Sequence, residues 1–166
     1  TKKEEYTINF KQTQQGDTYL ISAEDDQVDL LVGEAADGAE VTFGTKTGYE
    51  FTETPVLVKS EDRTETGIAV TEKDGKYTFT MPAYPVTVKG APSPVKYTIA
   101  YELNGGAAEN RTEYTIEDRT FTLKNPTKDG FVFLGWTSES VTEPVRQMKV
   151  VMGTTGNLKF TANWRE

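Results

Sequence analysis

Two tryptophans and a surplus of carboxylates are the residues of this 166-residue chain that could bind a ligand or do chemistry. Trp136 and Trp164 offer flat indole faces, which suit stacking on sugar rings. A buried indole in a small module, by contrast, removes about 150–250 Å² from water and contributes roughly 4–6 kcal/mol as an upper bound. We therefore expect both indoles to serve cores, and we keep Trp164 together with Tyr84 and Tyr101 as candidate ligand-binding residues for a glycan or a peptide.

An acidic cluster near the N-terminus could bind calcium, which takes six to eight oxygen ligands from carboxylates and carbonyls. Its members are Glu24, Asp25, Asp26 and Asp29. Their spacing lacks the D-x-D-x-D-G pattern of a dedicated calcium loop, so a solvated acidic segment is the expected structure. The run EKDG at 72–75 is expected to be a hairpin turn for the same reason.

Composition excludes several kinds of catalysis. The chain has no cysteine and no histidine, so it lacks a thiol nucleophile, an imidazole base, a disulfide and an ordinary zinc or copper site. The serines lie in no G-x-S-x-G turn, and the glycines form no phosphate-binding loop. With 26 acidic residues, some pair would satisfy the spacing of a glycosidase by chance. We predict that the protein is not an enzyme, with no catalytic residues, cofactor or bound metal.

The net charge of −8 is confined to one half of the chain. Residues 1–90 hold 9 basic and 17 acidic residues, whereas 91–166 hold 9 of each. A chain without a basic patch repels phosphate backbones, so nucleic acid is excluded as a partner. No stretch approaches the roughly 18 apolar residues of a membrane span, and the first ten residues lack the apolar run of a signal peptide.

A heptad occurs twice and predicts two related modules. TKTGYEF at 45–51 and TKDGFVF at 127–133 both read as a tight turn that leads into a strand. An alternating Tyr-Thr-Ile strand opens each half, at 6–8 and at 97–99. A further alternating strand closes each half, at 86–89 and at 158–164. The heptad is therefore expected to form the same structural corner in two β modules.

Period-2 runs rich in Thr, Val, Tyr and Phe predict strands throughout both halves. They lie at 6–11, 40–43, 55–58, 76–81, 86–89, 97–103, 113–116, 120–123, 131–136, 147–151 and 158–164. One segment, 22–38, leaves an alternative open: a short helix capped by Ser22, with Val28, Leu31 and Val32 on one face.

The boundary between the modules is expected at 91–95, where Pro92 and Pro94 favour a stiff, extended chain. The predicted domains are 1–90 and 96–166, joined by this linker.

The second module resembles a known family. YTIAYELNGGA, FTLKNPTKDGFVFLGWT and GTTGNLKFTANW occur in this order, and together they resemble the Listeria/Bacteroides repeat, the internalin B-repeat-like family of bacterial surface proteins. The resemblance covers 96–164. The first module, 6–90, is similar to a more divergent relative, most clearly in YTFTMPA at 77–83. It departs from the family by lacking the Gly-Trp pair and the closing Trp.

The resemblance implies a mainly β fold (α+β at most) of two small β-grasp-like modules in tandem, with the helix short or absent. It also implies a secreted, extracellular protein of the bacterial cell surface or cell wall. Such repeats serve as non-catalytic spacers, stalks or adhesion surfaces, flanked by neighbouring repeats of the parent protein. The alternative is a module that binds a carbohydrate or protein ligand, such as a host or wall glycan, through exposed aromatics.

Overall fold

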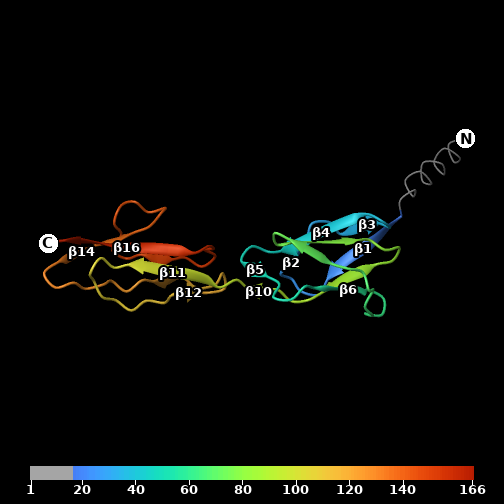
Figure 1. The fold of residues 1–166 in the computed structure, drawn as a ribbon, viewed down its shortest axis with the longest axis horizontal. Helices are drawn as coiled ribbons and strands as arrows, with labels where there is room; N and C mark the ends of the chain where they lie inside the picture. Colours follow the sequence, from blue (N-terminus) through green and yellow to red (C-terminus); the bar gives the residue numbers. More distant parts are fainter. Residues whose placement is uncertain (1–16) are drawn as a thin grey trace, which may run out of the picture. The chain divides into compact units, whose positions relative to one another are not determined.

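The computed structural model describes residues 17–166, so the strand expected at 6–11 lies outside the described residues. The chain divides into two compact units, Thr1–Ser93 and Pro94–Glu166 (Figure 1). Throughout 17–166 the regular elements are strands, and no helix is present. The prediction of a mainly β fold with the helix short or absent is confirmed.

A mixed four-stranded sheet organises the first unit. Its order is β3 (Glu34–Ala36), β1 (Thr18–Ala23), β9 (Val86–Lys89) and β6 (Val56–Lys59). The central strands β1 and β9 run parallel, and both outer strands are antiparallel to their neighbours. Ile21 of β1 is buried between exposed neighbours, as expected when one face of a sheet covers a core.

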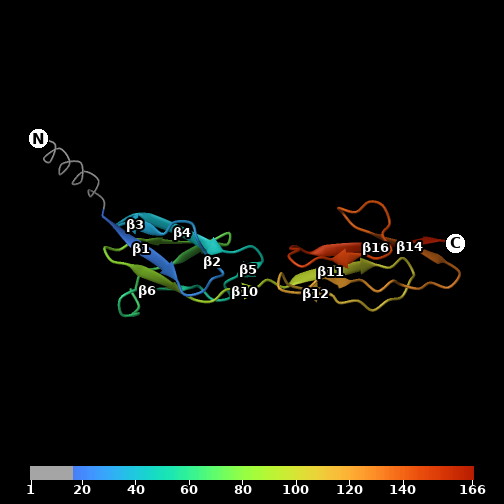
Figure 2. The same cartoon turned by 180° about the vertical axis from the view of Figure 1, so that it is seen from behind.

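An antiparallel second sheet completes the first unit (Figure 2). Its order is β2 (Val28–Leu30), β4 (Glu40–Thr45), β8 (Lys76–Thr80) and β7 (Thr71–Lys73). The core residues of the unit come from both sheets, and Phe43 at its centre is fully buried. The buried residues are Ile21, Val28, Val41, Phe43, Leu57, Tyr77, Phe79, Met81, Val86 and Val88.

The helix considered for 22–38 is wrong, because this segment forms β2, β3 and tight turns. The side-chain oxygen of Asp25 accepts a hydrogen bond of 2.8 Å from the Gln27 amide. Such a contact stabilises a turn in competition with helix. The run at 72–75 is the expected hairpin turn between β7 and β8, and Asp74 and Gly75 both have positive φ, of 53° and 78°, as a type I′ turn requires.

The second unit repeats the mixed sheet. Its order is β12 (Glu113–Tyr114), β11 (Tyr97–Glu102), β16 (Leu158–Arg165) and β14 (Val132–Thr137). The central strands β11 and β16 are again parallel, and the outer strands are again antiparallel (Figure 1). Trp136 is the largest fully buried side chain in the described chain.

The second sheet of this unit has two strands, β13 (Phe121–Thr122) and β15 (Lys149–Val150), paired antiparallel. The core is formed by residues from both sheets and their connections. They are Ile99, Tyr114, Leu123, Phe133, Trp136, Met148, Val150, Phe160 and Ala162. Two further short strands are β5 (Tyr49–Glu50) and β10 (Ser93–Pro94), the latter inside the segment 91–95 that was expected to be a linker.

Each strand of the second unit has a counterpart in the first unit. In both mixed sheets the first and last strands are central and parallel, so β3-β1-β9-β6 matches β12-β11-β16-β14. The second sheets also share one antiparallel pair. The pair β4 and β8 of the first unit corresponds to the pair β13 and β15 of the second unit. The first unit adds β2 and β7 at the two edges.

This correspondence explains the repeated heptad. In each unit the heptad lies between a strand of the second sheet and the outer strand of the mixed sheet, from the end of β4 toward β6 and from beyond β13 into β14. In the first unit it also contains the short strand β5. Gly48 and Gly130 hold the turn with φ of 85° and 82°, a conformation that suits glycine. The strand that corresponds to β11 is β1, at Thr18–Ala23. The segment 6–8, which the repeated Tyr-Thr-Ile pattern predicted as the opening strand, lies outside the described residues.

Candidate functional site

Tyr84, the first candidate ligand-binding residue, lies in the first unit. Its half-buried ring packs against the core, and the Lys59 ammonium lies 5.3 Å from the ring centroid. Together with Glu61 and Pro85 these residues line a depression of about 190 Å³. The Tyr84 ring therefore packs on the core and also borders this depression.

Tyr101 lies in the second unit and is held from both ends. Its hydroxyl donates a hydrogen bond of 2.7 Å to the Arg111 carbonyl. Its ring centroid lies 5.9 Å from that of Trp136 and 6.2 Å from that of Phe160. Burial raises the pKa of the Tyr101 hydroxyl, and the positive charge of Arg111 partly offsets this effect. Tyr101 is therefore part of the packing around the core.

Trp164 is half-buried over the same core. Its Nε1 donates a hydrogen bond of 3.0 Å to the Leu103 carbonyl, and its ring lies 5.4 Å from that of Phe133. The Lys128 ammonium lies 5.9 Å from the indole. Because Tyr84 belongs to the other unit, neither unit holds all three candidate residues.

Trp136 is a core residue, as expected from the sequence. Its exposed fraction is 0%, and the rings of Tyr101, Phe133 and Phe160 surround it. Among the described atoms its indole Nε1 finds no hydrogen-bond partner. The indole contributes apolar volume and offers no accessible face to a ligand.

The acidic residues near the start of the first unit are used in local structure. Glu24 forms an ion pair with Arg63, and Asp25 stabilises its own turn. Within 17–166 there is no group of three or more acidic residues placed to hold a metal ion.

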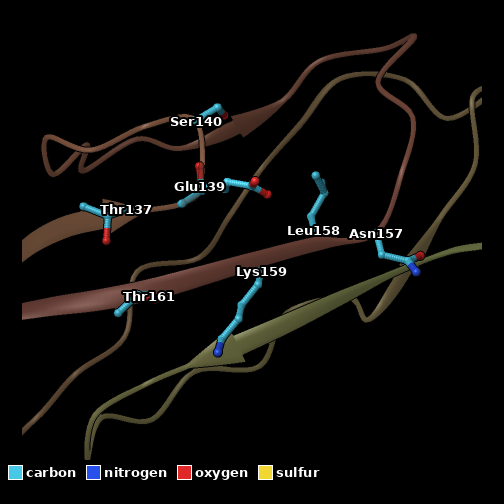
Figure 3. A pocket seen from close by; sticks show the side chains of 8 residues that line it. Thr137, Glu139, Ser140, Asn157, Leu158, Lys159 and Thr161 are labelled. Carbon is cyan, nitrogen blue, oxygen red and sulfur yellow. The ribbon is translucent and has the colours of Figure 1, made fainter.

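A hollow that the sequence did not reveal lies on the second unit. We call it the polar groove; its volume is about 640 Å³. It is lined by Thr137, Ser138, Glu139, Ser140, Asn157, Leu158, Lys159 and Thr161. Figure 3 shows Lys159 and Thr161 on β16, with Glu139 and Ser140 on the segment that follows β14.

Seven of the eight residues that line the polar groove carry a hydrogen-bonding side chain. Four hydroxyls, one amide, one ammonium and one carboxylate face it. Asn157 is already fixed, since its side-chain oxygen accepts a hydrogen bond of 2.9 Å from the Thr98 amide. No aromatic ring lines the groove, and Glu139 is the one carboxylate among its lining residues. This arrangement suits hydrogen bonding to an extended polar ligand and lacks the paired carboxylates of glycoside hydrolysis.

Part of this groove had a weak signal in the sequence. The run TSES at 137–140 concentrates hydroxyl groups directly after the Gly-Trp pair. Its partner segment, 157–161, is about twenty residues away and joins it only because β14 and β16 are paired.

A membrane-spanning helix is absent from the part of the chain that the structure describes.

The protein belongs to the class of small tandem β modules, because the same mixed-sheet arrangement occurs in both units. Residues 97–163, which lie within the second unit, match the family model of the Listeria-Bacteroides repeat domain. The resemblance expected for this segment is confirmed. No curated protein and no solved structure matches the chain.

Proposed function

We propose that this chain is a non-catalytic tandem-repeat region of a bacterial cell-surface protein, acting as a spacer or an adhesion surface. The observation that carries the proposal is that every strand of the second unit has a counterpart in the first unit. A chain that builds the same small module twice gains length and surface without needing a catalytic centre. The match of residues 97–163 to a repeat-domain family supports the same conclusion.

The use of the aromatic side chains also supports a structural role. Phe43 and Trp136 are fully buried, one in each unit. Tyr101 and Trp164 are tied to backbone carbonyls by their own polar atoms. Small modules need large apolar side chains to bury enough surface, and these residues meet that need.

The alternative is a module that binds a glycan or protein ligand through Tyr84, Tyr101 and Trp164. Two of these rings favour it, because each is partly accessible and lies beside a lysine, Lys59 for Tyr84 and Lys128 for Trp164. An ammonium next to an aromatic face is a common arrangement in recognition of polar ligands.

Two measurements test the proposal. Antibodies raised against residues 17–166 should stain intact producing cells as strongly as permeabilised cells, with a cytoplasmic enzyme as the negative control. Staining that requires permeabilisation would overturn the surface role. For the alternative, a panel of host and wall glycans is titrated while tryptophan emission is followed. Saturable shifts would establish ligand binding, and an unchanged emission would favour the spacer.

A further inference from the structure

The second unit lacks a strand that the first unit has. In the first unit β7 pairs antiparallel with β8 along the whole of β7, from Thr71 to Lys73. The corresponding strand of the second unit is β15, which has β13 on one side and no strand on the other. The first unit therefore shows that an antiparallel strand fits this edge of the fold.

The register of β15 leaves backbone groups at that edge. The Leu123 amide donates to the Met148 carbonyl at 2.8 Å, and the register continues through Thr122↔Lys149 and Phe121↔Val150. Hydrogen-bonded and non-hydrogen-bonded pairs alternate along an antiparallel ladder. Lys149 consequently directs its N–H and C=O away from β13, toward the open edge.

That edge borders a hollow. A second depression, of about 170 Å³, is lined by β15 and by the segment after β14. It shares Ser138, Ser140 and Leu158 with the polar groove, and we call the two together the β15 groove. Its lining includes Met148, Lys149, Val150 and Val151 along the strand. The β15 edge thus borders a hollow whose opposite wall is the segment after β14.

Apolar side chains mark the end of this channel. Val151 and Met152 are exposed to 58% and 57%, although Val151 follows directly on the buried Val150. The Val151 carbonyl accepts hydrogen bonds from the amide and the hydroxyl of Thr154, at 3.1 and 2.6 Å. Strand pairing therefore has to stop at Val151, and an occupant would contact these two side chains with its end.

The charge of the β15 groove differs from that of the whole chain. In the depression beside β15, Lys149 is the one charged residue of the lining. In the polar groove Lys159 and Glu139 carry opposite charges, and the Lys159 ammonium also lies 3.9 Å from the Glu102 carboxylate. The chain as a whole carries −8. A positive charge with no carboxylate in the lining at this edge favours an acidic occupant.

We propose that the β15 groove binds an extended acidic peptide segment of a partner protein, which adds to β15 as an antiparallel strand. The inference deepens the adhesion role proposed above and rests on it. The peptide takes the position that β7 holds beside β8. Main-chain hydrogen bonds to Lys149 provide affinity, and the hydroxyl groups and lysines of the groove select for polar and acidic side chains.

The chain's own β7 provides a probe. An acetylated and amidated peptide copies residues 67–74 with Glu in place of Lys73, and it is titrated into the isotope-labelled full chain. We expect saturable chemical-shift changes confined to 138–141, 147–152 and 157–161. Saturable shifts located elsewhere, or no shifts at millimolar peptide, would overturn the proposal. Broadening of the same signals with protein concentration alone would assign the edge to a second copy and would also overturn it.

Substitutions separate backbone pairing from charge. Lys149→Pro removes the outward N–H and should weaken binding at least tenfold, whereas Lys149→Ala should weaken it only severalfold. Thr122→Pro is the matched control, because Thr122 directs its backbone toward the opposite edge; its affinity should remain within twofold. If either proline variant fails to fold, Ser140→Trp fills the channel from its other wall and should abolish binding. Equal affinity in all variants would refute strand addition while leaving the surface localisation test unaffected.

Discussion

The indole of Trp164 lies directly against the α-carbon of Gly106. A Cβ at position 106 would come within 2.3 Å of Trp164 Cζ2 and 3.0 Å of Cη2. The same indole donates its Nε1 hydrogen to Leu103, three residues earlier in the same turn. The closing tryptophan and the glycine-rich turn, 58 residues apart in sequence, therefore form one structural contact.

Gly106→Ala should lower the free energy of unfolding by about 1–3 kcal/mol, the usual cost of an added methyl group in a packed site. The indole cannot move without losing its hydrogen bond to Leu103. Chemical denaturation followed by circular dichroism gives the value.

Gly33→Ala is the control for this substitution, since a Cβ there meets nothing within 4 Å, and its stability should remain within about 0.5 kcal/mol of the parent. In combination with Trp164→Leu, the cost of Gly106→Ala should fall to less than half. Additive effects of the two substitutions would show that the contact does not determine stability.

The glycine of the repeated heptad supports a second prediction. Gly130 has a φ of 82° and open space where a Cβ would lie, so an alanine there is strained by its backbone and not by a clash. Gly130→Ala should cost about 1–2 kcal/mol. Gly130→Asn should cost less, because asparagine tolerates this conformation. Thermal unfolding of the two variants measures the difference, and equal losses would contradict the argument.

The corner itself could be predicted from the sequence, because a turn glycine followed by alternating aromatics is a local signal. The first strand of the first unit could not. The pattern Tyr-x-Ile occurs at 6–8 and again at 19–21. In β1 the intervening residue is Leu20, which is apolar although it is 61% exposed. The apolar–polar alternation that predicts a strand is therefore missing from β1.

The polar groove illustrates a second limit. Its lining residues at 137–140 lie at and just after the end of β14, and those at 157–161 lie at the start of β16. The two segments meet only because β14 and β16 pair in the folded unit. Neither segment has a recognisable ligand motif by itself. The open edge of β15 has no sequence signal either. It is recognised only by comparison with the first unit, where β7 lies at the corresponding position.

Trp136 should tolerate loss of its N–H better than loss of its volume. Its side chain is fully buried and its Nε1 has no hydrogen-bond partner among the described atoms. Trp136→Ala should cost about 3–5 kcal/mol because it leaves a cavity, and Trp136→Phe should cost clearly less because no hydrogen bond is broken. Urea titration compares the two variants. In the parent protein, iodide should quench Trp164 and leave Trp136 unaffected; quenching of both would contradict its burial.

Two buried tyrosines and one half-buried tyrosine predict how stability depends on alkaline pH. Burial raises the pKa of Tyr77, Tyr101 and Tyr114 above the ordinary value of 10.0. Above pH 10 the unfolded chain therefore loses phenol protons that the folded chain retains, so the folded state binds more protons and its stability falls as pH rises. The contribution is complete below pH 10 and is lost as pH increases through the raised values. Urea midpoints measured between pH 8 and pH 11.5 should be constant up to about pH 9.5 and then decline. Tyr114→Phe removes one of the three phenols, at the cost of its hydrogen bond to the Gly156 carbonyl, and should make the decline shallower. A decline of unchanged steepness would assign the alkaline sensitivity to other groups.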